Sequence, residues 1–281
     1  MHLIDSHCHV HFNAYKDDMN VVIRRSLDDG VFMITVGTQN DTSRYGLEVA
    51  EKYEGVWATV GLHPKHLVKQ EFHDEDEIAT IKTREEKFDV ELYRSLAMHP
   101  KCVGIGENGL DFYRIPEGHE ADEIKSNQIA TARAHFDLAT EMNLPLSIHT
   151  RDAYKEQEKL IAEYVGAGKI SKRGVIHCFS GSLEQAMNFI DLGFCVSVTG
   201  IVTFSKDLQK VVRGIPLEKL LIETDAPYLS PAPERGKRNE PWKVKYIVQT
   251  IAEIKGTSTE EVGRITLQNT LDLFDKIVIP V

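Results

Sequence analysis

The sequence contains little cysteine, with four in 281 residues. Cys8, Cys102, Cys178 and Cys195 lie far apart and form no Cys-x-x-Cys pair. The N-terminus leads directly into a structural motif and shows no signal peptide, so we expect reduced thiols in the cytoplasm and no disulfide. A chain of this length buries about 70–75% of its unfolded surface, so it needs no covalent cross-links to hold a core.

Long hydrophobic runs are also missing. No apolar stretch approaches the ~20 residues that a helix needs to cross a bilayer, so no membrane partner is expected. Basic residues are not in excess either, because 33 lysines and arginines face 43 aspartates and glutamates, for a net charge of −10. This balance argues against a protein that coats nucleic acid over a long track, although it allows a small local phosphate site.

The sequence does contain a repeated alternation of short apolar, β-branched runs with polar-apolar helical patterns. Helical patterns include 18–28, 43–53, 122–142, 153–165 and 183–191, and late helices are expected near 243–255 and 259–274. The expected strands are 2–5, 31–36, 56–60, 102–105, 146–148, 175–176, 194–198 and 220–222.

Strands that alternate with helices predict a parallel sheet, because parallel neighbours need crossover connections. Eight such units in one domain is the number that closes into a barrel. We therefore predict an α/β fold with a single (β/α)8 TIM-type barrel domain over residues 1–281. A doubly wound open sheet is the structural alternative. Residues 65–100, which include the acidic run 71–77, form an insertion between strands three and four and are interpreted as a solvated helical face on the barrel rim.

Two histidines stand at the end of the first expected strand, in Asp5-Ser6-His7-Cys8-His9. Side chains two apart on an extended segment share a face, so His7 and His9 can bind one metal ion. Alone, such a pair is a modest signal, since paired histidines also occur as core or loop residues.

Further potential ligands recur at the ends of later strands. Glu107 follows the fourth strand and Asp225 follows the eighth, while His149 and His177 end the fifth and sixth. The C-terminal ends of barrel strands form the rim where barrel active sites lie. Four imidazoles and two carboxylates are too many for one tetrahedral zinc ion. We therefore predict two divalent ions about 3.5–4 Å apart, and the residue types leave Zn, Mn and Mg open.

The chemistry of the ligands suggests a role for each. Glu107 has two oxygens and comes from the middle of the strand series, so it is expected to bridge the ions as a catalytic residue. A water between two such ions loses a proton near neutral pH, and Asp225 is placed to accept that proton as general base. A helix N-cap is the structural alternative for Asp225. The remaining ligands are expected in two sets: His7, His9 and Asp225 on one ion, and His149 and His177 on the other.

Several neighbouring residues are candidates for substrate contacts or for support of the ligands. Arg151, two positions after His149, is able to clamp an anionic group through its planar guanidinium, with a plain ion pair as the alternative. His63 is placed to donate a hydrogen bond at the rim, with a structural loop role as the alternative. Asp111 and Tyr113 follow the expected bridging residue and are expected to orient ligands.

A basic loop follows Asp225. It contains Arg235, Lys237 and Arg238, three basic residues within four positions. A solvated charge run is the usual explanation for such a loop, but its position beside the expected metal site favours contact with a substrate phosphate.

Other chemical motifs are weak or missing. Gly104-x-Gly106-x-x-Gly109 formally matches a dinucleotide fingerprint, but it places Glu107 where a pyrophosphate would sit. The sequence contains no P-loop, no Gly-x-Ser-x-Gly elbow and no zinc-deaminase signature. Cys178 beside His177 suggests a thiol nucleophile, which a metal-activated water makes unnecessary.

At these residues the sequence resembles the TatD family of metal-dependent hydrolases, within the amidohydrolase-like barrels. It departs from the family pattern at Asn108, which replaces an apolar residue and should affect packing more than chemistry, and in the longer, more acidic stretch between His63 and the fourth strand. The matching motifs run in family order along essentially the whole chain: Asp5-Ser6-His7-Cys8-His9, Gly61-Leu62-His63-Pro64, Gly106-Glu107-Asn108-Gly109-Leu110-Asp111, His149-Thr150-Arg151, His177-Cys178-Phe179-Ser180-Gly181, Val198-Thr199-Gly200-Ile201-Val202-Thr203-Phe204, Glu223-Thr224-Asp225-Ala226-Pro227-Tyr228-Leu229 and Arg235-Gly236-Lys237-Arg238-Asn239-Glu240-Pro241.

The resemblance implies a (β/α)8 barrel, divalent metals and hydrolysis of phosphodiester bonds in DNA, as an exonuclease. The implied partner is DNA, single-stranded or at strand ends. By motif matching, the resemblance assigns the metal ligands to the six residues already named: His7, His9, Glu107, His149, His177 and Asp225.

Two alternatives stay open. The same barrel and metals also suit hydrolysis of small esters, lactones or cyclic amides, and neutralising Arg235 and Arg238 should then matter little. The other is a non-enzymatic metal-containing scaffold that binds a partner through its acidic insertion.

Overall fold

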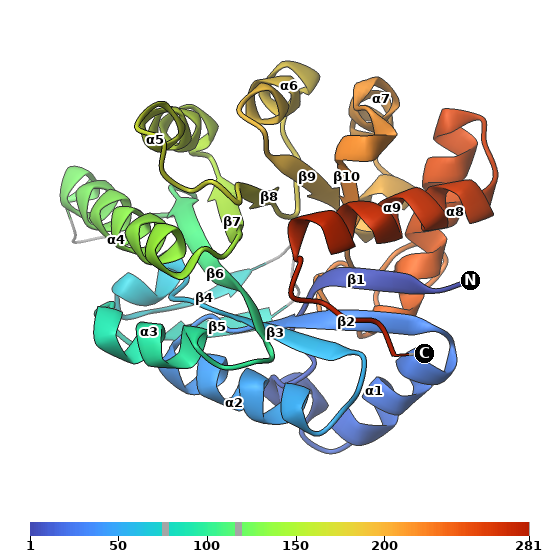
Figure 1. The fold of residues 1–281 in the computed structure, drawn as a ribbon, viewed down its shortest axis with the longest axis horizontal. Helices are drawn as coiled ribbons and strands as arrows, with labels where there is room; N and C mark the ends of the chain where they lie inside the picture. The colour runs from blue at the N-terminus through green and yellow to red at the C-terminus, as the bar shows by residue number, and fades with distance from the viewer. Residues whose placement is uncertain (75–78, 116–119, 281) are drawn as a thin grey trace.

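Eight parallel strands form the centre of the protein in the computed structural model, which describes residues 1–74, 79–115 and 120–280. They are hydrogen-bonded in the order β1-β2-β3-β6-β7-β8-β9-β10 and curl into a nearly closed barrel with helices outside, as Figure 1 shows. The predicted (β/α)8 barrel is confirmed. The strands are β1 Leu3–Cys8, β2 Val31–Val36, β3 Val56–Val60, β6 Cys102–Asp111, β7 Leu146–Arg151, β8 Gly174–Ile176, β9 Cys195–Val198 and β10 Leu220–Ile222.

The helices follow the strands in the predicted alternation, and side-chain caps fix several of their first turns. Ser182, Ser205 and Ser258 each accept a hydrogen bond from the backbone N–H three residues later, which satisfies a donor that the helix itself leaves free. The helices are α1 Met19–Asp28, α2 Asn40–Glu51, α3 Val90–Ala97, α4 Ala121–Met142, α5 Tyr154–Gly166, α6 Leu183–Asp191, α7 Lys206–Gly214, α8 Val244–Lys255 and α9 Thr259–Leu273.

The seam between the first and last strands is joined by hydrogen bonds from side chains and from the segments that follow the strands. Ser6 Oγ donates to the Ile222 carbonyl oxygen at 3.0 Å. The backbone N–H of Thr224 donates to Asp5 Oδ1 at 2.9 Å, and the N–H of Asp225 donates to the His7 carbonyl oxygen at 2.9 Å. These bonds place Asp225 directly beside the end of β1.

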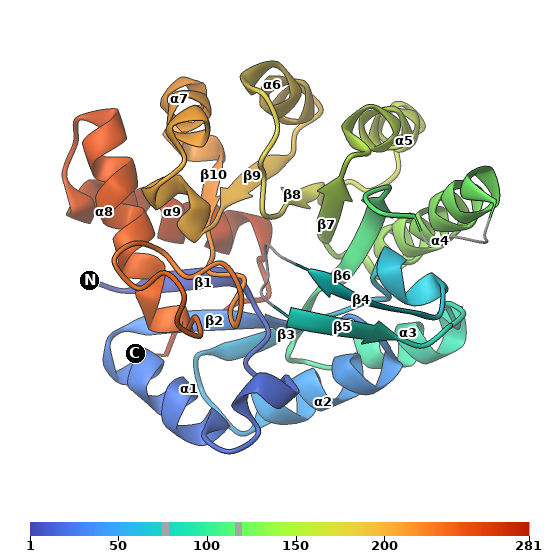
Figure 2. The ribbon, with the colours of Figure 1, turned by 180° about the vertical axis from the view of Figure 1, so that it is seen from behind.

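One end of the barrel is filled by apolar side chains beneath α9. Phe274, which follows α9, is fully buried in a cluster with Ile4, Ile34, Val103 and Leu221 from four different strands. Figure 1 shows α9 crossing this end, and the opposite view in Figure 2 shows β4 and β5 at the other end. The polar C-terminal ends of the strands therefore face away from the apolar plug.

The insertion between β3 and β6 differs from the prediction. A solvated helical face was expected over 65–100, but among the residues that the structure describes there, helix is confined to α3, apart from a short 3-10 turn over Pro64–Leu67. Strands β4 Gln70–Asp74 and β5 Ala79–Thr83 pair instead as an antiparallel hairpin. The second of these segments holds two threonines and an isoleucine, residue types that favour strands, and its local preference outweighs the acidic character of the region. Residues 75–77 of the acidic run lie outside the described residues.

Within the described part of the chain, no helix is both long and apolar enough to span a bilayer. All four cysteines are free thiols.

Candidate metal centre

Local irregularities in two strands aim the candidate ligands into the mouth of the barrel. The pairing of β1 with β2 shifts register between Asp5 and Cys8, and the pairing of β6 with β7 shifts between Ile105 and Asn108. Such bulges re-aim side chains next to active sites. Asn108 stabilises the second bulge, because its Nδ2 donates to the carbonyl oxygens of Ile105 and Ser147 at 3.1 Å each.

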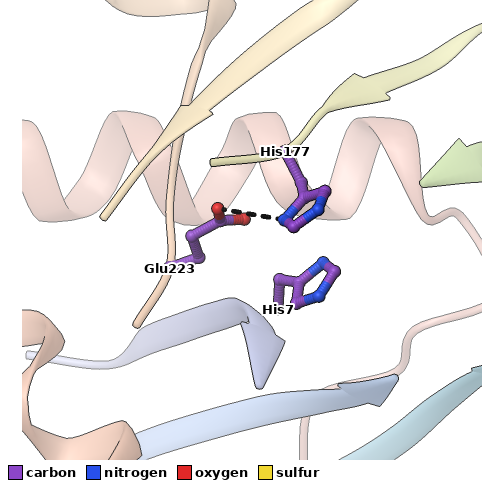
Figure 3. A group of neighbouring side chains, drawn as sticks. All are labelled: His7, His177 and Glu223. Atoms are coloured by element: carbon purple, nitrogen blue, oxygen red, sulfur yellow. Dashed lines mark ion pairs between the residues drawn. The ribbon is translucent and has the colours of Figure 1, made fainter. Parts of the chain in front are cut away.

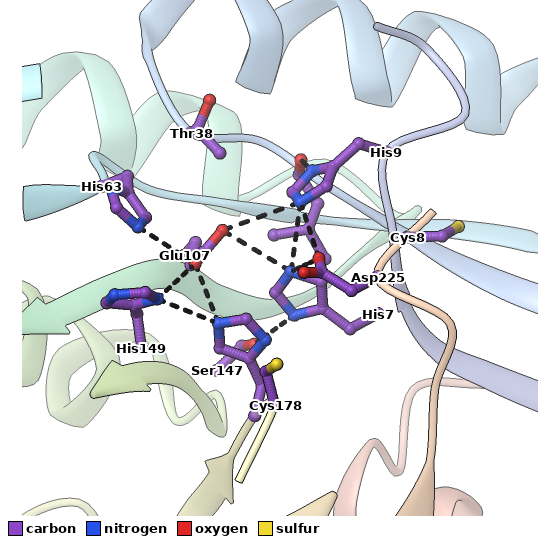
Figure 4. A network of polar contacts seen from close by, with 12 residues as sticks. His7, Cys8, His9, Thr38, His63, Glu107, Ser147, His149, Cys178 and Asp225 are labelled. Atoms are coloured by element: carbon purple, nitrogen blue, oxygen red, sulfur yellow. Dashed lines mark hydrogen bonds and ion pairs between the residues drawn. The ribbon is translucent and has the colours of Figure 1, made fainter. Parts of the chain in front are cut away.

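The first candidate set surrounds one oxygen of Glu107 (Figure 4). His7 Nε2 lies 3.3 Å from His9 Nε2 and 3.5 Å from Glu107 Oε2. Asp225 Oδ1 lies 3.7 Å from His7 Nε2 and 3.4 Å from His9 Nε2. Two ligand atoms held at about 2.0–2.2 Å by one tetrahedral ion are about 3.3–3.6 Å apart. His9 Nε2 lies 3.8 Å from Glu107 Oε2, and these five spacings fall in or slightly above that range, as expected for side chains gathered around one ion site.

The second candidate set surrounds the other oxygen of the same carboxylate. Glu107 Oε1 lies 2.9 Å from His177 Nε2 and 3.2 Å from His149 Nδ1, and these two nitrogens are 3.3 Å apart. The structure thus brings all six predicted ligands together, with one Glu107 oxygen toward each predicted set. Their function as ligands stays a prediction.

Hydrogen bonds on the far side of two imidazole rings define which nitrogens have free lone pairs. His9 Nδ1 lies 2.7 Å from the Val36 carbonyl oxygen, which can only accept, so His9 Nε2 presents a lone pair to His7. His149 Nε2 donates to Asp111 Oδ2 at 3.0 Å, so His149 Nδ1 presents a lone pair to His177. The lone pairs of His9 Nε2 and His149 Nδ1 thus point into the centre, 3.3 Å from His7 Nε2 and His177 Nε2, and imidazole nitrogens beside carboxylate oxygens are a donor set that fits a divalent metal.

Two buried carboxylates orient the imidazoles of the second set. Asp111, predicted to orient a ligand, binds His149 as described. Glu223 lies 3.5 Å from His177 Nδ1 and also accepts hydrogen bonds from the backbone N–H of Cys178 and the hydroxyl of Ser197. Figure 3 shows this carboxylate beside the His177 ring, which stacks on His7 with 3.9 Å between ring centroids. A carboxylate behind a ligating histidine is the usual support of a metal site.

The electrostatics of the centre favour positive charge. Burial acts to raise the pKa of Glu107, but the imidazoles of His63 and His177 outweigh it and hold the pKa well below its usual range. Burial acts to lower the pKa of His177, but the carboxylates of Glu107 and Glu223 outweigh it and raise the pKa well above its usual range. The buried Glu107 carboxylate is therefore an anion that a bound cation would neutralise.

His63 is held as a hydrogen-bond donor. Its Nδ1 accepts from the backbone N–H of Lys65 at 3.1 Å, so the proton of the neutral ring is on Nε2. That Nε2 lies 3.3 Å from Glu107 Oε1. The predicted donor role at the rim therefore agrees with the ring's hydrogen bonds, while contact with substrate stays a prediction.

The basic candidates divide into two groups. Arg151, the last residue of β7, places its guanidinium 3.7 Å from the ring centroid of Tyr113. Arg238 binds Asp18 through two hydrogen bonds of 2.9 and 2.5 Å, and Lys237 pairs with Glu234 at 3.0 Å. These two residues of the basic loop are thus held by acidic neighbours.

Arg235 differs from the other basic residues of its loop. Its guanidinium lies 4.0 Å from the ring centroid of Phe204, and the described residues give it no acidic partner. Three basic residues of this loop were predicted to contact the substrate. Arg235 is the one that has no acidic neighbour among the described residues.

Sequence reasoning gave no role to two residues that support the centre. Glu223 stands two positions before Asp225, and residues two apart in extended chain share a face, so this spacing was the signal that could have found it. Lys65 Nζ lies 3.2 Å from Asp111 Oδ1 and also donates to the Tyr113 carbonyl oxygen at 2.5 Å. No sequence pattern marks Lys65, because its partner lies in a different β/α unit.

Comparison with known proteins places the chain in a family. Residues 4–275 match the family model described as TatD related DNase. The chain belongs to this TatD family. A relative from Bacillus subtilis (strain 168), described as "Uncharacterized metal-dependent hydrolase YabD", is 37% identical over 97% of this chain and 98% of its own length. Human "Deoxyribonuclease TATDN3" is 31% identical over 98% of this chain and 95% of its own length.

Solved structures agree with this membership. The crystal structure of YJJV, a TatD homologue from Escherichia coli K12, superposes with a TM-score of 0.82 at 27% identity and covers 97% of this chain and 98% of that one. N-isopropylammelide isopropylaminohydrolase from Burkholderia multivorans shares the fold alone, at 13% identity and a TM-score of 0.57. The protein is a metal-dependent hydrolase of the TatD family.

Proposed function

We propose that this TatD-family chain is a divalent-metal-dependent deoxyribonuclease that hydrolyses phosphodiester bonds and works inward from the ends of DNA strands. The observation that carries the proposal is the Glu107 carboxylate, whose two oxygens face two separate sets of ligand atoms. A carboxylate shared between two ions is the arrangement of enzymes that clamp both oxygens of a phosphodiester displacement. The names of the family model and of the human relative support DNA as the substrate.

Each proposed residue has a defined task. His7, His9 and Asp225 would hold one ion, His149 and His177 the other, and Glu107 both; Zn²⁺, Mn²⁺ and Mg²⁺ are the candidates. Bound ions would supply Lewis-acid chemistry and make water a stronger acid. The Asp225 carboxylate would take a proton from the attacking water, because hydrogen bonding to His9 outweighs burial and keeps its pKa low enough for it to be an anion.

Cationic and donor groups at the rim would bind the substrate. The His63 Nε2–H and the Arg151 guanidinium would contact phosphate oxygens, and their fixed hydrogen bonds and ring contact limit the entropy lost on binding. The basic loop adds Arg235, and to a lesser extent Lys237 and Arg238, which have acidic partners. Free thiols at all four cysteines agree with a reducing cytoplasm as the site of action.

A matrix of metals against substrates tests the function. Purified chain would be assayed with Mg²⁺, Mn²⁺ or Zn²⁺ on linear single-stranded DNA, circular single-stranded DNA, blunt duplex DNA and a carboxylic ester. We expect metal-dependent release of nucleotides from linear single strands and resistance of the circle, which has no ends. Asp225→Asn should lower the rate at least about a hundredfold, the range of a lost general base.

The matched control is Asp207→Asn, which removes an exposed carboxylate that pairs with Lys210 on α7 and should leave the rate unchanged. Intact DNA in every metal, together with rapid cleavage of the ester, would exclude the nuclease and favour the small-ester hydrolase. Cleavage of the circle would show endonucleolytic action and overturn the exonuclease part of the proposal.

A further inference from the structure

Phe204 and Arg235 form an exposed aromatic-cation pair on the loops that follow β9 and β10. Phe204 is 37% exposed, so part of its side chain faces solvent. The Arg235 guanidinium lies 4.0 Å from its ring centroid. The pair presents an apolar ring and a positive charge to solvent on the same side of the barrel as the metal centre.

The backbone under the pair is firmly built. A short 3-10 turn, Gly200–Thr203, leads into Phe204 and is packed so closely on the next loop that a side chain at Gly200 would meet the Leu229 carbonyl oxygen at 2.3 Å. Thr203 Oγ1 accepts a hydrogen bond from the Ala232 N–H at 2.8 Å. The loop of Phe204 and the loop of Arg235 are therefore fixed to each other.

The segment that leads to Phe204 begins beside the metal centre. Thr199, where β9 has ended, places its hydroxyl 4.0 Å from Cys178 Sγ, and Cys178 is the neighbour of His177. Phe204 stands five residues after Thr199, and the 3-10 turn between them rises about 2.0 Å per residue, so Phe204 lies about 10 Å along the turn from Thr199.

The charge of Arg235 is available to an anion. Its two basic neighbours in the loop pair with Glu234 and Asp18, whereas the described residues give Arg235 no carboxylate. Although the chain has a net charge of −10, the Arg235 guanidinium thus lies against a partly exposed ring with no carboxylate beside it among the described residues. Both parts suit one ligand, because a nucleobase stacks on a ring and its phosphate binds a guanidinium.

We propose that Phe204 is a stacking platform for a base of the single-stranded substrate, and that Arg235 binds a phosphate beside that base. This rests on the proposed nuclease function and specifies how the strand is held. Stacking tolerates every base, so the platform would hold the strand without a sequence requirement.

Binding measured apart from cleavage tests the platform. Anisotropy of a labelled single-stranded oligonucleotide would be titrated with Asp225→Asn protein in the presence of metal, alone and combined with Phe204→Ala, Phe204→Leu, Phe204→Trp or Arg235→Ala. We expect Phe204→Ala and Phe204→Leu to weaken binding about tenfold or more, and Phe204→Trp to preserve it. Leucine keeps the apolar packing under the loop, so its loss of binding would not reflect misfolding.

Salt dependence separates the two contributions. Arg235→Ala should reduce the slope of log affinity against log salt by about one, since it removes one phosphate contact. Phe204→Leu should lower affinity with an unchanged slope. Tyr45→Ala is the matched control, because it removes another exposed aromatic side chain, on α2, and should bind as the parent does.

The outcomes distinguish this inference from the proposed function. Equal binding by the parent and by Phe204→Ala and Phe204→Leu would overturn the platform, even if the wild-type protein degrades DNA. A parent protein that does not bind single-stranded DNA would also overturn it. Binding that depends on Phe204, in a wild-type protein that cuts no DNA, would support the platform and remove the nuclease proposal alone.

Discussion

At the scale of single residues, the metal centre depends on side chains that hold the candidate ligands in place and would not themselves contact a metal ion. Asp111 accepts hydrogen bonds from His149 Nε2, the backbone N–H of Tyr113 and Lys65 Nζ. Its two oxygens thus serve three donors from three separate segments. The donor from His149 fixes the tautomer in which Nδ1 is free, and this tautomer is the one that can bind metal.

Replacing Asp111 with asparagine tests this support. An amide would offer one acceptor and place an N–H₂ group against the remaining donors, so the His149 ring should lose its fixed orientation. We expect metal affinity at the second set to fall about 10- to 100-fold, the usual effect of losing such a partner. Competition with a chromophoric chelator measures it.

The control for this variant is Asp137→Asn, an exposed carboxylate on α4 that pairs with Lys169. It removes the same charge without contacting the centre and should titrate as the wild type does. If Asp111→Asn also titrates as the wild type, the carboxylate does not position His149 for metal.

The ligand residues could be predicted from sequence, but most of their partners could not. His7 and His9 share a face by the period of a strand, so their meeting follows from local geometry alone. Lys65 reaches Asp111 from another β/α unit, and Phe204 meets Arg235 across two loops. Contacts of this kind depend on how loops pack, which a single sequence pattern does not specify.

At the scale of elements, the strand centres were predicted correctly, but three strands that carry candidate ligands, β1, β6 and β7, extend beyond their predicted C-terminal ends. The fourth strand was expected at 102–105, but β6 extends to Asp111 and contains Glu107. Its second half, Glu107 to Asp111, is mostly polar and contains Asn108, Gly109 and Asp111, residue types that are depleted in strands, and it stays extended because β7 pairs with it through Asp111. Tertiary pairing therefore outweighs local preference where the site is built.

Helix α4 is attached to the barrel through a buried imidazole whose protonation is linked to stability. His135 Nε2 accepts the N–H of Leu62, which follows β3, and its Nδ1 donates to the Thr131 carbonyl oxygen at 2.8 Å. Burial lowers the pKa of His135 to about 4, below its ordinary value of 6.5. Because the folded pKa is the lower one, this contribution to stability is fully present above pH 6.5 and is lost as the pH falls toward 4.

His135→Gln tests this linkage between α4 and β3. Glutamine can still accept the Leu62 N–H but does not titrate, so the stability advantage of the wild type should shrink by about 2 kcal/mol between pH 7 and pH 5. Urea unfolding in EDTA measures both proteins without metal, and the titration of the other histidines cancels in the difference. If the difference in unfolding free energy between the two proteins is the same at pH 7 and at pH 5, protonation of His135 is not linked to stability.

At the scale of the whole molecule, the barrel separates two environments. An apolar plug around Phe274 fills the end beneath α9, while carboxylates and imidazoles with little exposure gather at the other end. Burying such a polar group is unfavourable unless each charge finds a partner. Burial of the apolar plug stabilises the fold, whereas burial of the charged groups at the other end destabilises it. Bound cations would offset part of that destabilisation.

Thermal unfolding at increasing metal concentration measures how much bound cations stabilise the folded protein. A ligand that binds only the folded state stabilises it by about 2.7 kcal/mol at a hundred times its Kd, so two ions should contribute about 5 kcal/mol. For a chain of this size we expect Tm to rise by about 10 °C and to keep rising with the logarithm of metal concentration. Glu107→Gln, which weakens the shared ligand of both sets, should lose most of this rise, whereas Asp137→Asn should retain it. A Tm that does not change with metal would mean that the cluster at the mouth of the barrel holds no ion, and the two-metal proposal would fail with it.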